Sequence, residues 1–213
     1  MSKEEQEEIR YRAWKNFNTQ TPYEPGSTFK PLVVAEAIEE GILSTEDTFE
    51  CGGSITIAGT TINCWKTSGH GTQTVEEALA NSCNVSLIQI GERISNSMFS
   101  SYLKKYGFGE KTGIDLPGEA EGILHEDGSV VDKATNSMGQ NFTSTPLQLI
   151  TGFSSVINGG YLLEPYIVSQ IVDENGTIVY EKKPTIRRQV ISNATSDIIR
   201  EYLQSVVTYG TGS

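Results

Sequence analysis

The chain has 213 residues and a mass of 23.3 kDa, which is enough for one large domain or two small ones and excludes a miniprotein held together by disulfides alone. Its 27 acidic and 16 basic residues give a net charge of -11, which disfavours nucleic acid and anionic membrane surfaces as partners. No apolar run is long enough to span a bilayer, and the acidic first ten residues are not a secretory leader. We expect residues 1–213 to form a single unit, with residues 1–22 as an N-terminal arm and residues 23–213 as a helical part with hairpins.

The first predicted elements are a charged helix over residues 3–13 and a buried helix that follows a turn at Pro25-Gly26. Apolar residues recur between residues 32 and 38, and Gly41 is placed to end that helix. A turn that leads directly into a buried helix puts Ser27 in the first helical turn.

The middle of the chain predicts a short hairpin over residues 49–65, with its turn at Ala58-Gly59. A capping box that starts at Thr74 opens a helix, which the polar residues 81–84 interrupt before a second helix begins. Side chains at such a junction can point into a cleft.

The rest of the chain predicts an α+β fold that is mainly helical and has two or three hairpins. The predicted elements are a helix over 98–106, a glycine-rich loop over 107–122, a helix from Pro146 to Gly159, a hairpin over 161–184 that turns at residues 174–176, and a last helix over 192–207.

A serine and a lysine three residues apart, Ser27 and Lys30, share one face of a helix start. A neutral lysine in that position can take the proton of a serine nucleophile, and the helix N-terminus favours a developing oxyanion. The spacing alone is common, and Ser101 with Lys104 repeats it on a helix that we predict to be solvated surface.

Three cysteines, Cys51, Cys64 and Cys83, are spaced unlike the usual zinc motifs, and His70 is a poor fourth ligand on sequence grounds. We therefore expect no metal ion and no cofactor. Buried or partly exposed thiols are the simpler interpretation.

The run Tyr23 to Pro31, YEPGSTFKP, closely resembles the nucleophile motif of class B penicillin-binding proteins, the D,D-transpeptidases of peptidoglycan synthesis. Ser82-Cys83-Asn84 stands 55 residues after Ser27, where that family has its S-x-N motif. The runs GFGEKTGIDLPGE and SMGQNFTSTPLQL also resemble family landmarks, and CWKTSGHGTQTVEEALANSCN is most similar to the sporulation-specific branch, which builds spore cortex.

The resemblance implies that Ser27 attacks the D-Ala-D-Ala end of a peptidoglycan stem peptide and forms an acyl-enzyme. It implies that Lys30 is the base, that Ser82 relays a proton, and that Asn84 holds the substrate amide and orients Lys30. β-Lactams would acylate the same serine. The resemblance also places the parent protein on the outer face of the cytoplasmic membrane, with cell-wall or spore-cortex assembly proteins as partners.

The third motif of the family, K-T-G, appears only at residues 111–113, which we predict to be a loop. The family's K-T-G strand would come after residue 213. The resemblance therefore implies that this chain forms the helical side of the transpeptidase fold, which β-lactamases share. It also implies that the central five-stranded sheet of that fold is largely absent from the chain. Because one oxyanion donor would then be missing, we expect the chain to acylate slowly or not at all.

The family's location outside the cytoplasmic membrane allows disulfides, and Cys83 lies inside the S-x-N motif. A bond between Cys64 and Cys83 would act on the turn that carries Ser82 and Asn84. Two unconnected thiols are an equally open interpretation.

Two alternative functions stay open. A serine β-lactamase or β-lactam sensor shares the Ser27 and Lys30 spacing but not the surrounding residues. A noncatalytic interaction module would use the acidic surface and the hairpins, and it would tolerate replacement of Ser27.

Overall fold

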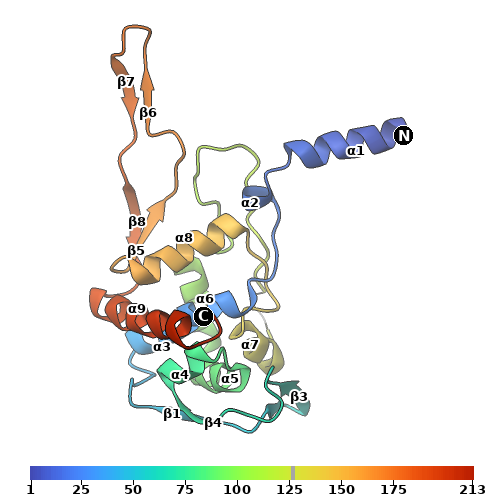
Figure 1. Cartoon of the computed structure of the whole chain (residues 1–213), viewed down its shortest axis with the longest axis vertical. Coiled ribbons are helices and arrows are strands. Elements are labelled where there is room, and N and C mark those ends of the chain that lie inside the picture. The colour runs from blue at the N-terminus through green and yellow to red at the C-terminus, as the bar shows by residue number, and fades with distance from the viewer. Residues whose placement is uncertain (126–127) are drawn as a thin grey trace.

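The computed structural model describes residues 1–125 and 128–213. Its first helix, α1 (Lys3–Trp14), buries no side chain and projects away from the rest of the molecule (Figure 1). The short helix α2 (Phe17–Gln20) is the first to reach the body, where Thr19 is buried and its carbonyl accepts a hydrogen bond from the backbone of Ala120. The predicted charged helix at the N-terminus is confirmed.

A central helix, α3 (Lys30–Glu39), packs against α5 (Asn84–Arg93), α8 (Pro146–Ile157) and α9 (Asn193–Thr208). Residues 30–37 are all buried, and all of them except Lys30 and Glu36 are apolar. The predicted buried helix is confirmed. Ser27, however, lies in a preceding 3-10 turn, η1 (Gly26–Phe29), since Pro31 has no N–H to donate to the Ser27 carbonyl.

The described residues form four antiparallel sheets, each of two strands. The pairs are β1 (Thr48–Cys51) with β4 (Gly71–Thr74), β2 (Ser54–Ile57) with β3 (Thr60–Asn63), β5 (Tyr161–Glu164) with β8 (Thr185–Gln189), and β6 (Gln170–Val172) with β7 (Ile178–Glu181).

The predicted hairpin turn at Ala58-Gly59 is confirmed, with both residues at positive φ as a tight two-residue turn requires. The predicted range of that hairpin was too long at its start. Residues 49–51 belong to β1 and pair with β4 instead.

A long two-stranded arm projects from the end of α8 (Figure 1). Its tip confirms the turn predicted at residues 174–176. Its base differs, because β5 pairs with β8, which lies beyond the predicted range. Pro165 directly follows β5, and Pro184 directly precedes β8. Neither proline has an N–H to donate to a strand partner, so the arm divides into two sheets at this point.

The remaining helices are α4 (Val75–Ala80), α6 (Asn96–Lys105) and α7 (Val130–Asn136). The helices predicted around α4, α5, α6, α8 and α9 are confirmed. Helix α7 was not predicted, although Ser129 and Asp132 form a capping box at its start. The α+β, mainly helical class is confirmed.

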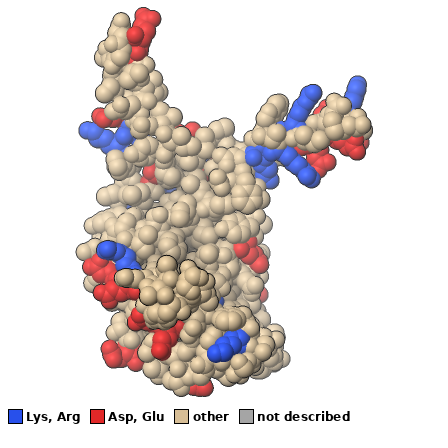
Figure 2. All heavy atoms as spheres, viewed as in Figure 1, with Lys and Arg blue, Asp and Glu red and all other residues tan. Residues whose placement is uncertain are grey.

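None of the helices in residues 1–125 and 128–213 is both long and apolar enough to cross a bilayer. On the face shown in Figure 2, acidic side chains are scattered over the lower part of the molecule, and basic side chains gather mainly on α1. That face has no continuous basic surface over the body of the molecule.

Candidate active site

Lys30 is the buried centre of the site. Its Nζ donates hydrogen bonds to Ser82 O at 2.7 Å, to Ser82 Oγ at 3.1 Å and to Asn84 Oδ1 at 2.8 Å. All three acceptors are neutral, so none of these hydrogen bonds adds an opposite charge that would offset the loss of hydration. Burial lowers the pKa of Lys30 from 10.5 to about 8, and the nearby sulfurs of Cys83 and Cys64 oppose that shift only in part.

Phe29 fixes the position of the turn that carries Ser27 and Lys30. Its ring is buried and packs edge-on against Phe99, Phe108 and Phe142, with ring centroids 4.9 to 6.1 Å apart. Phe108 and Phe142 come from the two landmark runs that we noted in the sequence. These runs therefore hold the turn that carries Ser27 through aromatic packing.

The segment before Ser27 is held by backbone hydrogen bonds to residues 139–144. Tyr23 and Ser144 exchange two of these bonds, and the N–H of Gly26 donates to the carbonyl of Gly139 at 2.8 Å. Gly139 has a φ of +79°, and a Cβ atom there would stand 2.1 Å from the Gly26 carbonyl oxygen. Only glycine fits at this contact.

Ser82 occupies a strained position at the end of α4. The N–H of Ser82 bonds to the carbonyl of Leu79 and the N–H of Cys83 to that of Ala78, which is the Schellman arrangement. Ser82 therefore has a φ of +49°, in the region that favours glycine. A serine at this position turns its carbonyl and its hydroxyl toward Lys30, and such strain is often found at functional sites.

Ser27 is exposed and lies between two hollows. One, of about 260 Å³, has a mostly apolar wall that includes Pro31, Leu79, Phe153, Leu203 and Val206. The other, of about 340 Å³, is lined by Ser27, Trp65, Ser82, Asn84 and Thr211. A substrate lying across Ser27 would therefore touch an apolar surface on one side and the S-x-N turn on the other.

The structure brings the four predicted catalytic residues to one place, since Lys30 bonds to Ser82 and Asn84, and Ser27 lines the same hollows as Ser82. Residues 111–113 lie in a loop, as predicted, and line neither hollow.

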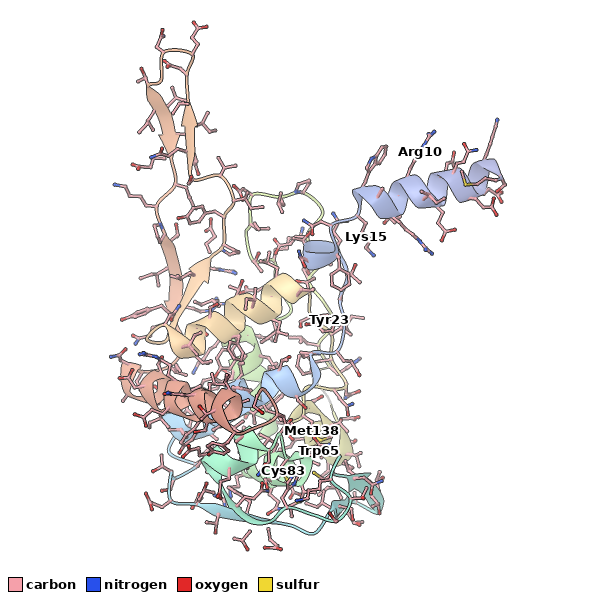
Figure 3. The ribbon with its side chains drawn as sticks, viewed as in Figure 1. Arg10, Lys15, Tyr23, Trp65, Cys83 and Met138 are labelled. Carbon is pink, nitrogen blue, oxygen red and sulfur yellow. The ribbon has the colours of Figure 1, made fainter. Side chains whose placement is uncertain are left out.

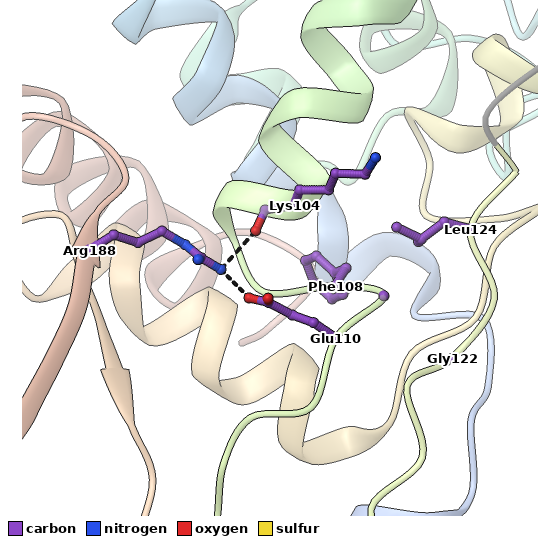
Figure 4. Close-up of a pocket in the computed structure, with 7 residues that line it drawn as sticks. Lys104, Phe108, Glu110, Gly122, Leu124 and Arg188 are labelled. Atoms are coloured by element: carbon purple, nitrogen blue, oxygen red, sulfur yellow. Dashed lines mark hydrogen bonds and ion pairs between the residues drawn. The ribbon is translucent and has the colours of Figure 1, made fainter.

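The second serine and lysine pair, Ser101 and Lys104, is exposed on α6, as predicted. Lys104 belongs to a different pocket, where its backbone carbonyl accepts a hydrogen bond from Arg188 beside Glu110 (Figure 4).

The three cysteines are buried free thiols, as the simpler interpretation predicts. Their spacing, which matches no usual zinc motif, does not keep them apart in the fold. The pairing of β1 with β4 places Cys51 next to His70, and the α4–α5 junction adds Cys83, so with Cys64 the four potential ligand atoms lie within 4.8 Å of one another.

Sequence reasoning missed several residues that shape the site. Gly139 and the rings of Phe108 and Phe142 lie in motifs that were noted only as landmarks. Thr211 closes the groove near Ser82, because its N–H donates to the carbonyl of Ala80 at 2.9 Å. No local pattern in the sequence indicates that contact.

Comparisons with known proteins show the family of the chain. The family model for the penicillin binding protein transpeptidase domain matches residues 1–213. Stage V sporulation protein D of Bacillus subtilis is 42% identical over 202 residues, which are 93% of this chain and 31% of that protein. A peptidoglycan D,D-transpeptidase FtsI homolog of Mesostigma viride is 28% identical over 228 residues, which cover 94% of this chain and 38% of that protein.

Among solved structures, penicillin binding protein 3 of Mycobacterium tuberculosis in complex with ampicillin superposes with a TM-score of 0.84 at 28% identity. The match covers 92% of this chain and 45% of that one. The chain belongs to the penicillin-binding protein transpeptidase family, and its predicted likeness to the sporulation-specific branch is confirmed. It spans about a third of the length of these curated relatives.

Proposed function

We propose that the chain carries the acylation site of a peptidoglycan D,D-transpeptidase, with Ser27 as the nucleophile and Lys30 as the base. The observation that carries the proposal is the environment of Lys30, which is buried, bonded to neutral acceptors only, and has a pKa of about 8. A lysine in that state loses its proton far more easily than one in water, which general base catalysis at neutral pH requires.

The acylation step follows from this arrangement. Ser27 Oγ attacks the carbonyl of the penultimate D-alanine, while its proton passes to neutral Lys30. When the C–N bond breaks, Ser82 Oγ, which is 3.1 Å from Lys30 Nζ, relays that proton to the amine of the leaving D-alanine. An amine of a second stem peptide then attacks the ester on Ser27, forms the cross-link and returns a proton to the serine.

Asn84 supports both partners in this scheme. Its Oδ1 accepts from Lys30 and its Nδ2 donates to the carbonyl of Asn63 at 3.3 Å, so the orientation of the amide is set from both ends. We assign it to hold the substrate amide beside Ser27. β-Lactams would enter the same site, which agrees with the ampicillin complex of the Mycobacterium tuberculosis neighbour.

The similarity to Stage V sporulation protein D supports a role in cell-wall or spore-cortex synthesis outside the cytoplasmic membrane. In that role the protein would work with assembly proteins of the same process. Oxidation of Cys64 and Cys83 to a disulfide stays a prediction. Their sulfurs are 3.9 Å apart, and an oxidant would have to remove two electrons and two protons to form the bond.

The test of the proposed function is a chimera in which this chain replaces the matched segment of Stage V sporulation protein D. We expect the chimera to release D-alanine from a pentapeptide that ends in D-Ala-D-Ala, and Ser27→Ala to abolish that release. Ser101→Ala is the matched control and leaves it unchanged. Full release by the Ser27→Ala chimera would contradict the assignment.

A further inference from the structure

Four side chains that the sequence keeps apart converge directly beneath the S-x-N turn. Cys51 ends β1, His70 stands just before β4, Cys64 follows β3, and Cys83 caps α5. Their ligand atoms all lie within 4.8 Å of one another. The three cysteines are buried and His70 is half-buried, in the lower part of the molecule where Figure 3 labels Cys83 and Trp65.

Two of the separations within this cluster match those around a tetrahedral metal ion, and none exceeds 4.8 Å. Zinc binds cysteine sulfur at about 2.3 Å and histidine nitrogen at about 2.0 Å, so in a tetrahedron two sulfurs stand about 3.8 Å apart and a sulfur and a nitrogen about 3.5 Å apart. Cys64 Sγ lies 3.9 Å from Cys83 Sγ and 3.6 Å from His70 Nδ1.

The imidazole of His70 contacts Cys64 and Trp65. Its Nδ1 faces the sulfur of Cys64, and its Nε2 is buried without a hydrogen-bond partner among the described residues. Trp65 packs edge-on against the ring at 5.3 Å and shields that side of the cluster. The ring therefore presents Nδ1 to the sulfurs.

Hydrogen-bond donors contact the sulfur of Cys83. The N–H and the hydroxyl of Ser86 both point to Cys83 Sγ, at 3.5 and 3.3 Å.

We propose that Cys51, Cys64, His70 and Cys83 bind one zinc ion in a closed Cys₃His site. On binding, the thiols that are still protonated release their protons to solvent, and Nδ1 of neutral His70 gives the fourth bond. No position is left for water, so the ion is structural rather than hydrolytic. The proposal does not depend on the chemistry assigned to Ser27.

The ion would connect the S-x-N turn to the rest of the fold. Cys83 stands between Ser82 and Asn84, so a metal bond to its sulfur ties that turn to β1 and to the segment that carries Cys64 and His70. Bound zinc would also occupy both sulfurs that a disulfide between Cys64 and Cys83 needs. The two states therefore exclude each other.

The test is a titration of the 213-residue chain, reduced and freed of metal with a chelator, with cobalt(II) under anaerobic conditions. We expect the thiolate charge-transfer band and the intense d–d bands of tetrahedral cobalt to saturate at one ion per chain and to vanish when zinc is added. Cys51→Ser and His70→Ala should each weaken binding at least about tenfold. His125→Ala, which changes the other histidine, is the matched control and should bind as the wild type does.

Cys51→Ser and His70→Ala leave Cys64 and Cys83 in place, so they separate a metal site from a simple thiol pair. X-ray absorption of the zinc-loaded wild type gives a second measurement that needs no variant, with three sulfurs at about 2.3 Å and one nitrogen at about 2.0 Å expected. Octahedral cobalt spectra, less than half an ion per chain, or a zinc shell without three sulfurs would overturn the proposal.

Discussion

Lys30 Nζ lies 2.8 Å from Asn84 Oδ1, although 54 residues separate them in the sequence. This hydrogen bond joins the start of α3 to the start of α5 and brings the S-x-x-K and S-x-N motifs into one site. It adds no opposite charge to Lys30, whose pKa burial lowers to about 8. The predictions below concern that pair and the backbone that positions it.

The first prediction concerns the pH dependence of acylation in the chimera. Only neutral Lys30 can accept the serine proton, and its pKa is lowered to about 8. The rate of labelling by a fluorescent penicillin should therefore rise about tenfold per pH unit below pH 8 and level off above it. A rate that does not change between pH 6 and pH 9 would rule out Lys30 as the base.

The second prediction concerns Asn84→Asp, which places a carboxylate at hydrogen-bond distance from Lys30. An adjacent opposite charge stabilises the ammonium and raises its pKa by about 1 to 3 units. The midpoint of the pH profile should move upward by that amount, and labelling at pH 7 should slow at least about tenfold. Asn84→Ala is the control, because it removes the contact without adding charge and should not move the midpoint upward.

The third prediction separates the strain at Ser82 from its chemistry. Ser82→Gly and Ser82→Ala both remove the hydroxyl, but only glycine is comfortable at a φ of +49°. In urea unfolding, Ser82→Gly should be about 1 kcal/mol more stable than Ser82→Ala, and both should label at least about 100-fold more slowly than the wild type. Ala58→Gly, at a φ of +46° in an exposed turn, should gain similar stability and keep full labelling.

The fourth prediction concerns the contact between Gly139 and Gly26. Gly139 and Gly176 have nearly the same φ, +79° and +80°. Alanine at either position should therefore lose about 1 to 2 kcal/mol of folding stability from backbone strain alone. A Cβ atom at residue 176 meets nothing within 4 Å, whereas one at residue 139 meets the Gly26 carbonyl. Gly139→Ala should therefore be the less stable variant in urea unfolding and should also slow labelling of Ser27. Equal stability of the two variants would show that the close contact has no cost.

Local patterns in the sequence predicted the elements whose signals are short in range. Capping boxes, the Ala58-Gly59 turn and the apolar helix after Pro25-Gly26 each depend on neighbours within a few residues, and each appears in the fold. The spacing of Ser27 and Lys30 is of the same kind. Their approach to Ser82 and Asn84 came from the family resemblance, because it depends on how α3 packs against α5.

Contacts between distant short segments could not be predicted in this way. Strands β1 and β4 have four residues each, too few for alternation to specify a partner, and their pairing alone brings His70 to Cys51. For that reason the spacing of the cysteines does not indicate that they lie together. The aromatic packing of Phe29 against Phe108 and Phe142 could not be predicted either, because these residues are far apart in the sequence.

The central claim is that Ser27 is acylated with the help of Lys30. The most direct measurement is intact-mass and peptide mass spectrometry of the chimera after reaction with penicillin, with Lys30→Met as the variant and Lys104→Met as its matched control. We expect one penicilloyl group per chain on the peptide that contains Ser27, the same result for Lys104→Met, and at least about 100-fold slower reaction for Lys30→Met. Adduct on any other residue, or an unchanged rate for Lys30→Met, would contradict the account.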